Sequence, residues 1–132
     1  MALLNSTTPE ISTDRETLLL RRLLGLYEEE IQIYQQVLEL SREQGSLIKQ
    51  GRNIADIRRL LEKKKNCLVI IGRLEATEKT AKREWDQGRP NWSARGRTQL
   101  HEVLARVGEL IEKILLTEEE NDLQLIAKTR AV

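Results

Sequence analysis

The sequence predicts an all-α protein, an elongated antiparallel three-helix bundle or coiled coil whose C-terminal helical segment is able to move. Apolar residues recur at helical spacing, and residues 10–89 contain no proline. Seven glycines and two prolines are too few for a sandwich or barrel of short strands, which needs a turn about every 8–12 residues. A disordered chain is excluded because 39% of the residues are hydrophobic and 22 basic residues nearly balance 21 acidic ones.

A chain of 132 residues has room for one domain. We expect a flexible N-terminal arm at 1–13, the helical bundle at 14–127 and a short tail at 128–132. Within the bundle, the expected helices span about 14–50, 53–86 and 93–127. Each would be roughly 45–54 Å long at 1.5 Å per residue, so short connections give an up-down-up arrangement.

The first expected helix has a signal at each end. Thr13 and Glu16 have capping-box spacing, in which a hydroxyl and a carboxylate each satisfy a free backbone amide, and they predict a start after Thr13. Pro9 offers an earlier alternative start. Gly51 can adopt the left-handed conformation that ends a helix, so we expect the first helix to end just before it.

The second and third expected helices are separated by the loop around Pro90. Asn53, with Asp56 three residues later, is a typical N-cap and predicts the start of the second helix. The third helix starts near Ser93 or Thr98, and the sequence leaves both starts open.

Two lines of apolar residues run along the first helix. They comprise Leu20, Leu24, Tyr27, Ile31, Tyr34, Leu38, Ser41, Gly45 and Ile48, and then Leu19, Leu26, Ile33, Leu40 and Leu47. Together they cover an arc of roughly 160°, wider than the ~100° stripe of a surface helix, so this helix must pack on more than one partner. Either the other two helices cover the arc completely, or part of it forms a groove or a dimer face.

Beyond Leu115 the apolar pattern breaks. Thr117 is followed by three glutamates, and Leu123, Leu125 and Ile126 then form a short apolar patch. An acidic turn followed by large aliphatic residues is typical of a detachable amphipathic segment. Such a segment docks either on its own bundle or on a helix of another protein.

The sequence indicates that the protein is not an enzyme. It has one cysteine, Cys67, and one histidine, His101, which lie about 18 Å apart along the bundle if the helices turn around Pro90. That distance is too long for a nucleophile and its base. Ala105 stands where a zinc-protease motif starting at His101 needs its second histidine. We therefore expect no catalytic residue, no cofactor and no metal site.

The charge pattern gives no general attraction to nucleic acid or membranes, because the net charge is +1. Segment 89–97 interleaves arginines with Trp92, but we interpret it as a helix connection with solvated arginines. Lys64 falls on the apolar seam of the second helix and is expected to turn outward to reach solvent. No secretory signal and no apolar run of ~18 residues is visible, so we expect a cytoplasmic protein without membrane insertion.

The chain resembles the FlgN family of flagellar export chaperones over roughly residues 16–127. The residues that carry the resemblance are 23–31 (LLGLYEEEI), Tyr34, Leu38, Glu43, Leu47, Ile48, 51–54 (GRNI), Leu60, Lys64, Lys65, Leu68, Ile71, Leu74, Glu75 and 120–123 (ENDL).

The resemblance implies a cytoplasmic chaperone for the hook-associated proteins FlgK and FlgL. Such a chaperone holds its client as an unassembled monomer and delivers it to the flagellar type III export apparatus. The family grips the client's terminal helical segment with its own C-terminal helical region. Carried over to this chain, the resemblance places the partner-binding residues at Asn121, Leu123, Leu125 and Ile126.

Two other functions remain open at this point. A homodimeric coiled-coil scaffold or adaptor without a client would use the wide apolar arc for self-association. An RNA-binding helical module would depend on Arg95 and Arg97 and would bind less tightly as salt rises.

Overall fold

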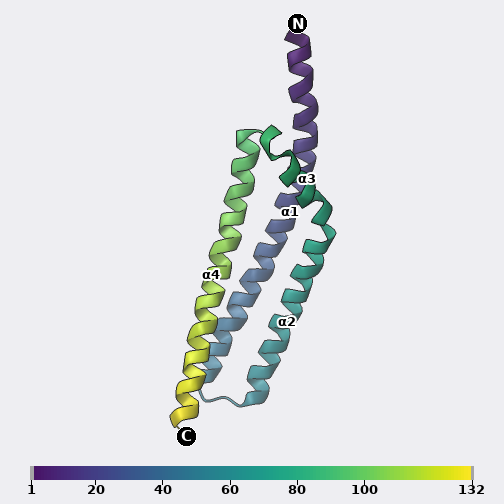
Figure 1. Cartoon of the computed structure of the whole chain (residues 1–132). Helices are drawn as coiled ribbons and strands as arrows, with labels where there is room; N and C mark the ends of the chain where they lie inside the picture. The colour runs from purple at the N-terminus through teal and green to yellow at the C-terminus, as the bar shows by residue number, and fades with distance from the viewer. Residues whose placement is uncertain (1, 132) are drawn as a thin grey trace.

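The computed structural model describes the backbone of residues 2–131 and the side chains of residues 14–130 (Figure 1). Its helices are α1 (Ala2–Lys49), α2 (Ile54–Thr77), α3 (Lys79–Gly88), the 3-10 turn η1 (Arg89–Asn91) and α4 (Ala94–Ala131). No strand occurs within residues 2–131, and the all-α prediction is confirmed.

Helix α1 is the shared support of the fold. The α2–α3 arm runs back along one side of it, and α4 returns along the other (Figure 1). Helices α2, α3 and α4 all pack against α1, whereas α2 and α4 scarcely contact each other. The prediction that the first helix needs more than one partner is therefore confirmed. A closed three-helix bundle, in which each rod contacts both others, is not what the structure shows.

The start of the first helix and the continuity of the second differ from what the sequence predicts. Helix α1 begins at Ala2 and not after Thr13. The second rod is broken at Glu78, which has φ −100° and ψ 13°, so residues 53–86 do not form one helix. The break allows α3 to redirect toward α1 and to bury Ala81 and Trp85, which are 2% and 3% exposed.

The connection between α1 and α2 follows the local sequence signals. Gly51 has φ +68°, its N–H donates to Ile48 O at 3.1 Å, and the N–H of Arg52 donates to Leu47 O at 3.0 Å. This pattern is a Schellman motif, in which a glycine ends the helix in the left-handed conformation. Asn53 Oδ1 accepts from Asp56 N at 3.0 Å, so the predicted N-cap is confirmed.

The start of α4 is held by a residue that lies far away in the sequence. Glu16 Oε2 accepts from Ser93 Oγ at 2.6 Å, and Glu16 Oε1 accepts from the backbone N–H of Ser93. Ser93 Oγ in turn accepts from Gly96 N at 3.0 Å, which makes Ser93 the N-cap. The third helix thus uses Ser93 and not Thr98. Glu16 caps α4 and does not take part in a capping box at the start of its own helix.

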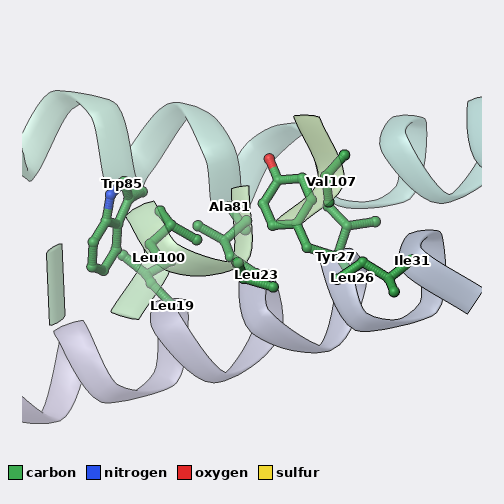
Figure 2. Packing of buried hydrophobic residues seen from close by; sticks show 10 residues of the cluster. Leu19, Leu23, Leu26, Tyr27, Ile31, Ala81, Trp85, Leu100 and Val107 are labelled. Carbon is green, nitrogen blue, oxygen red and sulfur yellow. The ribbon is translucent and has the colours of Figure 1, made fainter. Parts of the chain in front are cut away.

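The main hydrophobic core lies near the connection between α3 and α4, where these two helices meet α1 (Figure 2). Its buried members are Leu19, Leu23, Leu26, Tyr27, Ile31, Ala81, Trp85, Leu100, Val103 and Val107. The rings of Trp85 and Trp92 stack with centroids 5.4 Å apart, and Trp92 Nε1 donates to Trp85 O at 2.7 Å. The two tryptophans therefore hold the connection between α3 and α4.

Two glycine substitutions should have opposite effects on stability. Gly51→Ala should lower the free energy of unfolding by about 1–2 kcal/mol, because a side chain is strained at its φ of +68°. Gly25→Ala lies inside α1 with no atom within 4 Å of the added Cβ. It should raise the free energy of unfolding by about 0.5–1 kcal/mol. Urea unfolding followed by circular dichroism measures both changes, and equal signs would contradict the described backbone.

Candidate functional site

The predicted partner-binding residue Asn121 lies inside the α1–α4 interface. It is 2% exposed, and its Nδ2 donates to the backbone oxygen of Ser41 at 2.8 Å. An added Cβ at Gly45 would lie 2.6 Å from Asn121 Oδ1, so this glycine gives the amide its space. In this structure Asn121 fastens α4 to α1 and offers almost no surface to a partner.

A buried polar layer surrounds Asn121 and joins all three long helices. Lys64 of α2 is 7% exposed, and its Nζ donates to Gln44 Oε1 of α1 at 2.6 Å and to Glu118 Oε1 of α4 at 2.5 Å. Ser41 Oγ donates to the same Glu118 oxygen at 2.5 Å. We call Ser41, Gln44, Lys64, Glu118 and Asn121 the polar layer.

The polar layer corrects two sequence-based expectations. Lys64 does not turn outward to solvent, because a carboxylate and an amide meet its ammonium group inside the fold. The acidic turn after Leu115 does not end the seam of α4, because Glu118 points inward to Lys64. A signal existed in the sequence, since Ser41 and Lys64 both occupy seam positions where an apolar residue is usual.

Helix α4 continues without interruption beyond the polar layer. It runs to Ala131, so residues 128–131, expected as a tail, belong to the helix. Lys128 Nζ donates to the backbone oxygen of Lys49, the last residue of α1, at 3.0 Å. This bond satisfies a free carbonyl at the end of α1.

The other three predicted partner-binding residues are exposed to different degrees. The exposed fraction is 37% for Leu125, 49% for Ile126 and 61% for Leu123. At 100° per residue they lie about 40°, 140° and 200° around α4 from the buried Asn121. Leu125 therefore borders the α1 contact, while Leu123 and Ile126 form an apolar pair that faces away from α1.

An apolar groove separates α2 from α4 and is lined in part by Lys64 and Glu118 of the polar layer. It has a volume of about 540 Å³. Its lining comprises Tyr34 and Val37 of α1, Leu61, Lys64, Lys65 and Leu68 of α2, and Ile111, Ile114, Leu115 and Glu118 of α4. Of these, Leu61, Leu68 and Leu115 are 45%, 53% and 63% exposed. Sequence reasoning allowed for a groove beside the first helix, but it did not identify these walls.

A second polar cluster, made of the buried Glu30 and the half-buried Glu75 and Lys82, lies where α1 meets the break between α2 and α3. Burial, a hydrogen bond to Glu75 and the charge of Glu75 together raise the pKa of Glu30 to about 8, and the nearby charge of Lys82 only partly offsets them. Burial also raises the pKa of Glu75, but hydrogen bonds to Glu30 and Lys82 outweigh it, so the net shift is downward. At neutral pH, Glu30 is therefore protonated and able to donate to the ionised Glu75.

The two residues weighed as a nucleophile and its base lie in separate surroundings. Cys67 is buried on α2, and its thiol lies 3.8 Å from Gln36 Oε1. His101 is exposed on α4 and lines a hollow near the α3–α4 connection with Trp85 and Arg89.

Within residues 14–130, no group of three or more His, Cys, Asp or Glu side chains is placed to hold a metal ion. Among the described helices, none combines the length and the apolar character needed to cross a membrane.

Comparisons with known proteins do not place the chain in a family: no family model, no curated protein and no solved structure matches it. A proposed function therefore rests on the sequence resemblance and on the residues and geometry described above.

The protonated Glu30 should make stability depend on pH. In the unfolded chain Glu30 titrates near its usual 4.5, whereas in the fold it titrates near 8. Between these values the folded state holds more protons than the unfolded state, so the free energy of unfolding falls as pH rises. We expect a loss on the order of 3 kcal/mol from about pH 5 to about pH 8.

Glu30→Gln should remove most of this loss, because the amide can still donate to Glu75 and does not ionise. Other groups near Glu30 titrate outside the window. The pKa of Glu75 lies below 4.5, and burial raises the pKa of both Tyr27 and Tyr34 above 10.0. Burial lowers the pKa of Lys82, but its hydrogen bond to Glu75 outweighs this effect, so the pKa of Lys82 lies above 10.5. Urea unfolding of wild type, Glu30→Gln and the exposed neighbour Glu29→Gln as a control measures the effect. An unchanged pH profile in Glu30→Gln would contradict it.

Proposed function

We propose that this protein is an export chaperone of the FlgN type, which binds hook-associated proteins similar to FlgK and FlgL and keeps them unassembled. The observation that carries the proposal is the apolar pair of Leu123 and Ile126, which α4 presents away from α1 at 61% and 49% exposure. Isolated exposed aliphatic residues are common, but two on one helix face in the segment that the resemblance assigns to client binding favour a docking site.

The physical basis of the proposed activity is temporary coverage of an amphipathic helix. A client segment that polymerises through an apolar stripe must keep that stripe away from other copies before export. Leu123 and Ile126, one turn apart on α4, offer the start of a matching stripe, and Leu125 extends it toward α1. Asn121 holds α4 in place from the buried side and contributes to the client site by positioning α4.

Several parts of the proposal come from the resemblance. They are the identity of the client and its delivery to the type III export apparatus. The cytoplasmic location is implied by both the resemblance and the sequence, and the absence of a cofactor, nucleic acid or membrane insertion is an expectation from the sequence alone. The elongated three-rod outline suits such a role, because it leaves long helix faces open to a helical client (Figure 1).

Binding to a purified hook-associated protein from the same cell tests the proposal. Wild type should bind it, and the double variant Leu123→Ser and Ile126→Ser should bind at least about 10-fold more weakly, since two apolar contacts are lost. Point substitutions are preferable to removing all residues after Leu115, because that deletion would leave buried Lys64 without Glu118. Calorimetry measures the affinity.

Leu18→Ser is the matched control, because Leu18 is 53% exposed on α1, a different helix. It should bind like wild type. Failure of wild type to bind any hook-associated protein would overturn the proposed function and favour the scaffold without a client. Normal binding by the Leu123 and Ile126 variant would instead overturn the proposed site.

A further inference from the structure

We infer that a second copy of this chain covers the apolar groove, with α2 of each copy packed against α4 of the other. The inference concerns the apolar groove between α2 and α4 and does not depend on the proposed client. It rests on an uncovered apolar repeat, on the shape of the groove and on the charges of its two rims.

The uncovered repeat lies on α2. Ile54, Leu61 and Leu68 follow one another at seven-residue intervals and are 70%, 45% and 53% exposed. Spacing of seven residues aligns them on one face, in the pattern of a coiled-coil seam. Within the chain this seam has no facing helix, because α2 and α4 scarcely contact each other.

The groove has the shape of a helical bundle that lacks the helix between α2 and α4. Tyr34 and Val37 of α1 form its floor, Leu61 and Leu68 form one wall, and Leu115 belongs to the other wall. Both walls are helices that run along the groove, so the face suits further helices aligned with them. A second copy would bring such helices with the same apolar walls.

The rims of the groove carry opposite charges. On the α2 rim lie Arg58 and Lys65, and on the α4 rim lie Glu119 and Asp122, all of them exposed. Within residues 14–130 none of these four side chains belongs to an intramolecular ion pair. A helix of an unrelated protein would need acidic residues opposite the α2 rim and basic residues opposite the α4 rim to pair with both.

A second copy matches both rims by symmetry. A two-fold axis parallel to the helices places α2 of one copy opposite α4 of the other at the same height. The pair of Lys64 with Glu118 fixes that height. Positions along the helix axis can be counted from this pair at 1.5 Å per residue. Lys65 and Glu119 then differ by about 3 Å along the axis, and so do Arg58 and Asp122. Both basic residues therefore face acidic residues of the other copy, whereas a pairing of α2 with α2 would set like charges together.

Analytical ultracentrifugation of the full chain tests self-association. Wild type should form dimers in the micromolar range. Leu61→Glu combined with Leu68→Glu should weaken the dimer by about 100-fold or more, because charges would enter the apolar seam. Both residues are exposed, so circular dichroism should show an unchanged fold. The control Val69→Glu lies on the outer face of α2, is 45% exposed and should leave the dimer intact.

Disulfide trapping tests the arrangement of the copies. In a Cys67→Ala background, one variant carries Lys65→Cys and another carries Glu119→Cys. Mild oxidation of their mixture should give at least about 10-fold more covalent dimer than either variant alone, since helices packed across the groove lie about 8–10 Å apart. Lys63→Cys is the matched control, because Lys63 lines the hollow on the opposite side of α2 with Gln36.

Each outcome decides the inference. A monomer up to millimolar concentration, or a dimer that survives the Leu61 and Leu68 variant, would overturn it. Equal trapping with Lys63→Cys would overturn the arrangement of α2 against α4. Failure to dimerise leaves the proposed client untouched, because client binding is measured with Leu123 and Ile126 variants that lie outside the lining of the groove.

Discussion

The buried ammonium group of Lys64 is the constraint on which the arrangement of the three long helices depends. A charge at 7% exposure is costly unless it has close partners, and its partners come from both other helices: Gln44 of α1 at 2.6 Å and Glu118 of α4 at 2.5 Å. Both α2 and α4 pack along α1 and otherwise scarcely contact each other, so this ion pair is the direct link that matches Lys64 of α2 to Glu118 of α4. Both members of the pair also line the apolar groove.

The polar layer has a consequence for the surfaces offered to partners. By fixing Glu118 and Asn121, it extends the α1–α4 contact beyond Leu115, so that α4 leads into the exposed pair Leu123 and Ile126 as a continuous helix. The same ion pair joins the two walls of the groove at a defined register. The proposed client surface and the proposed dimer surface adjoin on α4. Ile126 lies seven residues after Glu119, on the face that carries the acidic rim, whereas Leu123 lies farther around the helix.

The sequence predicted those features that arise from contacts within a few residues. The cap formed by Asn53 and the left-handed Gly51 are of this kind, and both are confirmed.

The polar layer was not predicted, because Lys64 and Glu118 are 54 residues apart and either alone resembles a solvated charge. Glu16 has local capping-box spacing, but its carboxylate binds Ser93, 77 residues away. The break at Glu78 has no glycine or proline signal and follows from the packing of α3 on α1. Of the predicted site, the exposure of the three aliphatic residues followed from the pattern, whereas the burial of Asn121 depends on the tertiary contact with Ser41.

Amide hydrogen exchange along α4 tests most directly whether the polar layer holds the end of this helix in place. The bonds of Glu118 to Lys64 and of Asn121 to Ser41 predict that the amides of Asn121 and Leu123 exchange within about tenfold of that of Val107, in the hydrophobic core. Exchange of the Asn121 and Leu123 amides at the rate of an unstructured peptide, with Val107 still protected, would contradict this. It would mean that the end of α4 opens independently of the remaining fold.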